Sequence, residues 1–200
     1  MTQLELQANI SNEETAKLPA LKFEGKITIV DTPEAIAQAC TELARSSVIG
    51  FDTETRPSFK AGVSYRVALL QLSTTTHCFL FRLNLIPLDR EIVRLLENPK
   101  ILKIGADVIG DIRALRVLRH FKDRGFVDLQ SIIHEWGVAE KSLRKMAAIT
   151  LGQRVSKAQR LSNWEANSFT PQQKLYAATD AWVCVEIYNK LQSLPKVVKE

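Results

Sequence analysis

The order of strand-like and helix-like apolar patterns along the chain is the feature that most limits its fold. Four short apolar segments come first, at residues 26–30, 47–54, 66–74 and 77–83. A helical pattern at 33–46 separates the first two, and helical and extended patterns then alternate over 89–138 before a helical C-terminal third. Paired strands followed by strand–helix alternation are typical of a sheet with both parallel and antiparallel pairs. We therefore predict an α/β fold with a central mixed sheet of five to six strands flanked by helices.

The domain organisation follows from length and patterning. A chain of 200 residues is the size of one domain. Residues 1–24 are polar and weakly patterned, so we predict a flexible or loosely docked N-terminal extension, a single domain over 25–195, and a short tail over 196–200.

Three sequence features predict the cellular location: the length of the apolar runs, the pattern of the first residues and the spacing of the cysteines. No apolar run approaches the roughly 20 residues that span a membrane, and the first residues do not have the pattern of a secretory signal. The three cysteines are too far apart for a zinc motif and suggest no disulfide framework. We expect an intracellular protein, cytoplasmic if its source is bacterial, that does not associate with membranes.

Positive charge is concentrated in one stretch of the sequence. The net charge is +5, and residues 141–160 contain six lysines and arginines, among them Lys157 and Arg160, but no acid. Clustered cations supply sequence-independent contacts to the phosphates of a nucleic acid. A solvated helix face would explain the same stretch equally well.

Acidic residues stand at three places where the apolar pattern predicts burial or the end of an element. Asp52 and Glu54 end a buried strand, and their spacing of two puts both side chains on one face. Asp111 follows Gly110 between a predicted strand and a helix. Asp180 lies inside the last helix among apolar neighbours, one turn after Tyr176.

Each acid also has an ordinary structural explanation. Asp52 and Glu54 could belong to a surface loop, Asp111 could cap a helix, and Asp180 could accept a hydrogen bond from Tyr176 within the core. One metal site explains all of them together, because Mg²⁺ binds a few carboxylates, waters and phosphate oxygens. A pair of such ions can activate water and stabilise the leaving oxygen in phosphodiester cleavage.

Three ordered motifs resemble the DEDD superfamily of 3′–5′ exonucleases. They are "FDTE", "GADVIGDIRAL" and "LYAATDAWVCVEIY", and the segments "RVALLQLST" and "LSNWEANSFTPQQK" extend the similarity over about residues 26–191. Tyr176 in the third motif indicates the tyrosine subgroup, and the details are most similar to the Werner-syndrome-type exonuclease domain and to ribonuclease D. The motif acid is the one that follows glycine, which is Asp111, so we do not assign Asp107 to the motif.

The resemblance implies a ribonuclease H-like fold and a mechanism with two ions of Mg²⁺ or Mn²⁺. By this analogy Asp52 bridges both ions, Glu54 and Asp180 complete the first, and Asp111 supports the second. Tyr176 orients the attacking water, because an ordinary tyrosine pKa near 10 makes it a poor base at neutral pH. The implied activity is release of 5′-mononucleotides from the 3′ end of DNA.

The sequence constrains the substrate and the partners less than it constrains the active-site residues. RNA 3′-end trimming is the alternative activity, and a non-catalytic nucleic-acid-binding module on the same fold is a third possibility. Phe59, after the first motif, could stack on or wedge against the terminal nucleotide, and it could equally pack on the base of its own loop. The expected partner is therefore a nucleic acid, with DNA favoured over RNA, and an accessory protein could supply processivity.

Overall fold

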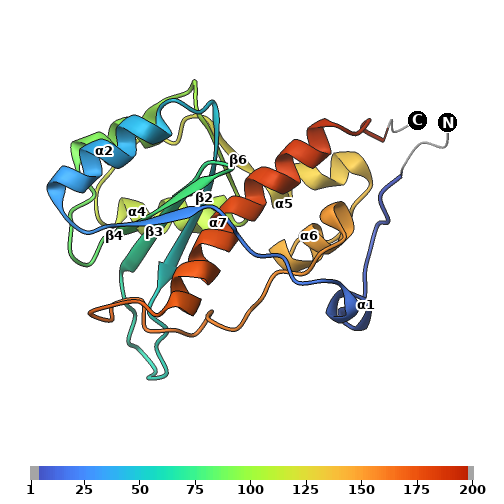
Figure 1. The fold of residues 1–200 in the computed structure, drawn as a ribbon, viewed down its shortest axis with the longest axis horizontal. Helices are drawn as coiled ribbons and strands as arrows, with labels where there is room; N and C mark the ends of the chain where they lie inside the picture. The colour runs from blue at the N-terminus through green and yellow to red at the C-terminus, as the bar shows by residue number, and fades with distance from the viewer. Residues whose placement is uncertain (1–4, 198–200) are drawn as a thin grey trace.

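The computed structural model describes residues 5–197 and shows a mixed sheet between two layers of helices (Figure 1). The six strands are β1 (Lys26–Val30), β2 (Val48–Thr55), β3 (Val67–Ser73), β4 (His77–Arg82), β5 (Leu102–Gly105) and β6 (Phe126–Asp128). Their order across the sheet is β1-β4-β3-β2-β5-β6. The β3 strand pairs antiparallel with β2 and β4, and the other three pairs are parallel. The prediction of a mixed sheet of five to six strands is confirmed.

The helices begin and end largely where the sequence signals them. They are α1 (Asn12–Lys17), α2 (Pro33–Leu43), α3 (Arg90–Glu97), α4 (Val108–Arg116), α5 (Leu129–Ile132), the 3₁₀ helix η1 (Ile133–Trp136), α6 (Leu143–Leu151) and α7 (Pro171–Gln192). Thr170 and Gln173 form a reciprocal capping box at the start of α7, and Pro171 occupies its first turn. None of the helices in residues 5–197 combines the length and the apolar character needed to cross a bilayer.

The apolar spacing of residues 110–121 predicts one helix there, and helix α4 differs from that extent. It begins two residues earlier, at Val108, because Asp107 adopts a left-handed conformation (φ 65°) that turns the chain out of β5. It ends at Arg116, whose guanidinium donates hydrogen bonds of 3.0–3.1 Å to the carbonyl of Phe121. This contact stabilises the loop that replaces the last predicted turn.

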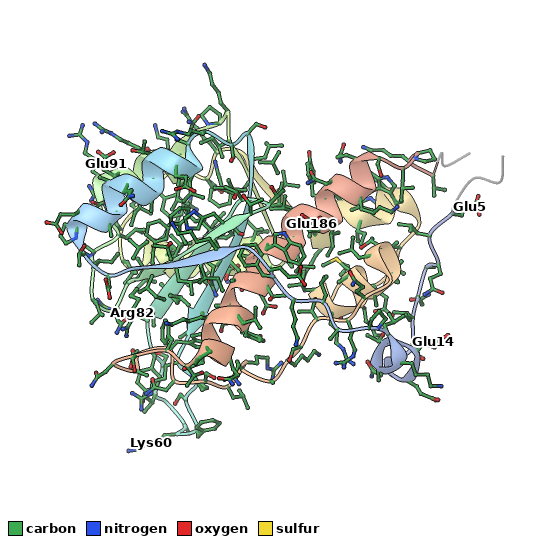
Figure 2. All side chains as sticks on the ribbon, viewed as in Figure 1. Glu5, Glu14, Lys60, Arg82, Glu91 and Glu186 are labelled. Carbon is green, nitrogen blue, oxygen red and sulfur yellow. The ribbon has the colours of Figure 1, made fainter. Side chains whose placement is uncertain are left out.

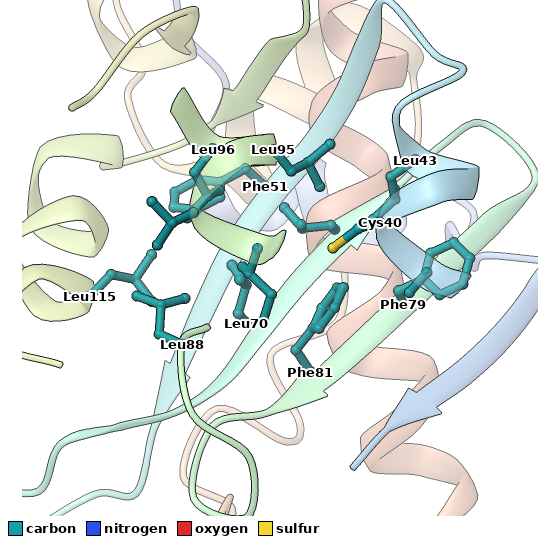
Figure 3. Close-up of a cluster of buried hydrophobic side chains, with 14 of the residues drawn as sticks. Cys40, Leu43, Phe51, Leu70, Phe79, Phe81, Leu88, Leu95, Leu96 and Leu115 are labelled. Atoms are coloured by element: carbon teal, nitrogen blue, oxygen red, sulfur yellow. The ribbon is translucent and has the colours of Figure 1, made fainter. Parts of the chain in front are cut away.

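Each face of the sheet packs against its own layer of helices. Side chains of α2, α3 and α4 meet one face, where Phe51, Leu70 and Phe81 are fully buried (Figure 3). The long helix α7 covers the opposite face, with α6 beside it (Figure 1). The second layer is therefore the one that contains the helix bearing Asp180.

The described part of the N-terminal segment lies against the domain. Ile10, Leu21 and Phe23 are buried, and they pack against the α6–α7 layer. The Leu21 N–H donates to the carbonyl of Arg154 at 2.9 Å, and the Phe23 N–H donates to Thr179 Oγ1 at 3.2 Å. These apolar contacts and backbone bonds hold residues 5–24 on the domain. Residues 1–4 of the predicted extension and 198–200 of the predicted tail lie outside the described residues.

Candidate metal centre and active site

Strand β2 presents Asp52 and Glu54 on the face of the sheet that α7 covers. Successive side chains alternate along a strand, so Gly50, Asp52 and Glu54 share this face, while Phe51 points into the opposite core. The two carboxylates thus come from a buried strand and not from a surface loop.

Gly50 sets how closely α7 approaches this strand. A Cβ atom at Gly50 would lie 1.9 Å from the carbonyl oxygen of Ala181, so only glycine allows the two backbones to meet. Ala181 is the residue after Asp180, and the close approach therefore brings the Asp180 carboxylate next to β2.

Three of the predicted carboxylates meet in this contact. One oxygen from each of Asp52, Glu54 and Asp180 lies within 4.8 Å of the others. Asp180 is only 7% exposed, and its Oδ1 atom is buried without a hydrogen-bond partner. Among the residues that the structure describes, no lysine, arginine or histidine forms an ion pair with any of these three acids.

The crowding of these acids shifts their ionisation. Burial raises the pKa of Glu54 to about 10, with further contributions from the charges of Asp52 and Asp180. Burial likewise raises the pKa of Asp180 to about 7, and burial together with Asp180 raises that of Asp52 well above its ordinary range. The protein alone therefore supplies too little positive charge to keep these groups ionised at neutral pH.

Asp111 lies at the edge of this group and is held by a different contact. Thr53 Oγ1 donates a 2.6 Å hydrogen bond to Asp111 Oδ1. Burial and the charge of Asp52 raise the pKa of Asp111 to about 8, while the Thr53 bond opposes that rise. No sequence pattern links Thr53 to Asp111, because 58 positions separate them.

The helix-cap explanation of Asp111 does not apply. Asp107 occupies the N-cap position of α4 and makes no side-chain capping bond, and the Asp128 carboxylate accepts from the Val108 N–H at 3.1 Å. Asp111 lies within the first turn of the helix, and its carboxylate contacts β2.

Tyr176 lies one helical turn before Asp180 on α7 and packs against the fully buried Trp164, with 6.1 Å between ring centroids. Burial and the nearby carboxylates of Asp180 and Glu54 raise the pKa of Tyr176 above its ordinary value of 10. The hydroxyl therefore stays protonated at neutral pH, and it can donate a hydrogen bond but cannot act as a base.

The carboxylate group fits a divalent metal ion. Its donor set is all oxygen, as Mg²⁺ and Mn²⁺ prefer, and the buried, unpartnered Oδ1 of Asp180 faces no protein donor. Asp52, Glu54 and Asp180 would hold the ion, with Asp111 adjacent to them. A bound divalent cation would supply the positive charge that the site lacks and would lower the pKa of a bound water.

The predicted substrate-contacting residues lie in two surface loops. Phe59 is 85% exposed in the β2–β3 loop, so it does not pack on the base of that loop; the neighbouring Lys60 stands at the loop tip (Figure 2). A cleft of about 400 Å³ separates this loop from Leu161 and Asn163.

Lys157 and Arg160 are exposed in the segment between α6 and α7. Their side chains make no hydrogen bond or ion pair with another part of the described chain. Neither Lys157 nor Arg160 forms an ion pair with the site carboxylates among the described residues.

Fold and site together define a ribonuclease H-like domain with a carboxylate group suited to divalent metal ions. Among solved structures, the Nibbler EXO domain of Aedes aegypti matches with a TM-score of 0.78 and 21% identity, covering 87% of this chain and 92% of that one. Ribonuclease D of Escherichia coli, described as an exoribonuclease involved in structured RNA processing, matches with a TM-score of 0.75 and 22% identity over 84% of this chain and 44% of that one. These similarities confirm the predicted fold.

The family follows from sequence comparison. A family model described as 3′–5′ exonuclease matches residues 27–195. The mouse bifunctional 3′–5′ exonuclease/ATP-dependent helicase WRN is 35% identical over 189 residues, which cover 88% of this chain but 13% of the mouse protein. The chain belongs to the 3′–5′ exonuclease family, and the predicted resemblance to the WRN and ribonuclease D type of DEDD exonuclease is confirmed.

Proposed function

We propose that this domain is a 3′–5′ exonuclease that removes 5′-mononucleotides from the 3′ end of DNA with the help of bound Mg²⁺ or Mn²⁺. The observation that carries the proposal is the group formed by the partly buried carboxylates of Asp52 and Glu54 and the buried carboxylate of Asp180, which no cation of the described chain neutralises. Metal ions held there would supply a nucleophilic water and stabilise the negative charge of the reacting phosphate.

The residues of the chain have separate parts in this proposal. Asp52, Glu54, Asp111 and Asp180 form the metal-binding set. Tyr176, with its proton retained, donates a hydrogen bond that orients the attacking water. The exposed ring of Phe59 stacks on the terminal base, and Lys157 and Arg160 contact backbone phosphates.

RNA is the second candidate substrate, and a specific observation supports it. The structural match to E. coli ribonuclease D covers 84% of this chain, and that protein is described as acting on structured RNA. The WRN match, at 35% identity, is described as a 3′–5′ exonuclease and ATP-dependent helicase, and this description names no substrate. No feature of the carboxylate group recognises a 2′-hydroxyl, so a direct comparison of matched substrates has to separate the two.

The test is a digestion ladder on matched DNA and RNA duplexes with recessed 3′ ends, labelled at either the 3′ or the 5′ end. We expect mononucleotide release from the 3′ end of DNA in Mg²⁺ or Mn²⁺, and none in EDTA. Asp52→Asn and Asp180→Asn should abolish it, whereas Asp31→Asn, at an exposed surface acid, should not. Activity that survives in EDTA would refute the proposal. Faster digestion of RNA than of DNA would show that RNA is the preferred substrate. Binding of 3′ ends without product would indicate a non-catalytic module.

A further inference from the structure

Gln71, in the middle of β3, carries a buried amide with no hydrogen-bond partner. Its side chain is 0% exposed, and neither Nε2 nor Oε1 bonds to any group of the described chain. Buried polar groups are nearly always paired, because an unpaired one destabilises the fold. A methionine would fill a similar volume without that cost, so core packing alone does not explain an amide at this position.

The strand register places Gln71 directly opposite Asp52. In the antiparallel β2–β3 pair, Asp52 is the partner of Gln71 and Glu54 is the partner of Leu69. Side chains of directly opposed residues share a face, with Cβ atoms about 4.5–5.5 Å apart. Gln71 is thus a neighbour of the carboxylate at the centre of the proposed metal site.

Two leucines border the Gln71 amide on this face of the sheet. Leu69 precedes it on the same face, and Leu80 is its partner on β4. Both leucines pack with Ala177 and Ala178 of α7, which close this layer over the sheet. The buried polar atoms without a hydrogen-bond partner in this layer include the Gln71 amide and Oδ1 of Asp180, beside the indole nitrogens of Trp164 and Trp182.

We propose that Gln71 is a positioning residue for Asp52, and that its Nε2 amide donates a hydrogen bond to the Asp52 carboxylate when that carboxylate holds a divalent cation. This inference rests on the proposed function. An amide offers two N–H donors, and an ionised carboxylate has several acceptor sites, so one oxygen can serve Gln71 while others serve the ion. Groups that orient a metal ligand in this way change metal affinity by about 10- to 100-fold when they are removed.

The first test is Gln71→Met, with Leu69→Met as the matched control at the position opposite Glu54 on the same face. Unfolding is followed by circular dichroism in EDTA and across a titration with Mn²⁺. In EDTA we expect Gln71→Met to be at least as stable as the unmodified protein. The Mn²⁺ concentration that gives half of the rise in melting temperature should increase about 10- to 100-fold in Gln71→Met and stay unchanged in Leu69→Met.

A second measurement needs no substitution. The Gln71 side-chain amide can be recognised by NMR through its contacts with the Leu69 and Leu80 methyl groups, and Mg²⁺ should shift one of its protons downfield. An unmoved resonance, or an unchanged Mn²⁺ midpoint in Gln71→Met, overturns the role of Gln71. If the unmodified protein shows no metal-induced rise in melting temperature, the proposed function itself fails, and the inference about Gln71 fails with it.

Discussion

Replacing Asp180 with asparagine should stabilise the metal-free protein. Burial raises the pKa of Asp180 from its ordinary 3.8 to about 7. Between these values the folded protein binds more protons than the unfolded chain, so the free energy of unfolding falls as pH rises through this window. At pH 8 the ionised carboxylate carries its full penalty, which asparagine removes while keeping an oxygen acceptor near Tyr176.

The magnitude follows from the size of the shift. One pKa unit corresponds to about 1.4 kcal/mol, so the shift of Asp180 gives Asp180→Asn an advantage of up to about 4 kcal/mol at pH 8 and about 2 kcal/mol at pH 5. For a domain of this size, 1 kcal/mol moves the melting temperature by about 2–4 °C. Asp180→Asn should therefore melt up to about 16 °C above the unmodified protein in EDTA at pH 8.

Metal ions should reduce this advantage. Mg²⁺ at one hundred times its dissociation constant stabilises the unmodified protein by about 2.7 kcal/mol, and Asp180→Asn gains less because it has lost a charged ligand. Melting curves in EDTA and in Mg²⁺, at pH 5 and pH 8, measure both effects, and Asp31→Asn controls for a general change of charge. The reasoning is refuted if Asp180→Asn is no more stable than the unmodified protein in EDTA at pH 8, or if its advantage does not grow from pH 5 to pH 8.

Three further perturbations test other parts of the site. Tyr176→Phe keeps the ring and loses the hydroxyl, so kcat should fall by about 100-fold with an unchanged metal midpoint; an unchanged kcat would remove Tyr176 from the reaction. Charge reversal of Lys157 and Arg160 together should reduce the slope of log affinity against log salt by about two, whereas Lys100→Glu, in the exposed α3–β5 turn, should leave it unchanged. Deletion of residues 1–24 exposes the apolar surface that this segment covers. The free energy of unfolding should fall by several kcal/mol, at about 1.5–3 kcal/mol for each buried side chain. An unchanged melting temperature would show that the segment contributes no stability.

The sheet and most helices could be predicted because their signals are local. Alternation with a period of two places Asp52 and Glu54 on one face regardless of the rest of the fold. Thr170 and Pro171 mark the start of α7 by their own chemistry. These features need no knowledge of which segments pack together.

Other features could not be predicted because they depend on contacts between distant segments. The left-handed turn at Asp107, which starts α4 early, leaves no periodic signature in the sequence. The segment 5–24 has too few apolar residues for a recognisable pattern, yet Leu21 and Phe23 are buried against residues more than a hundred positions away. In the sequence Gln71 is an ordinary strand residue, and its position opposite Asp52 becomes known only from the strand register.

Gly50 shows how a contact of this kind produces the site. In the sequence it interrupts an apolar strand, where glycine has a low intrinsic preference. In the structure the carbonyl of Ala181 occupies the space that a side chain at Gly50 would need, and any Cβ there would push α7 away from β2. Asp180 comes from α7, and Asp52 and Glu54 come from β2, so this separation determines whether three carboxylates can share one ion. The metal centre therefore depends on a residue with no ligand atom as strictly as on the acids themselves.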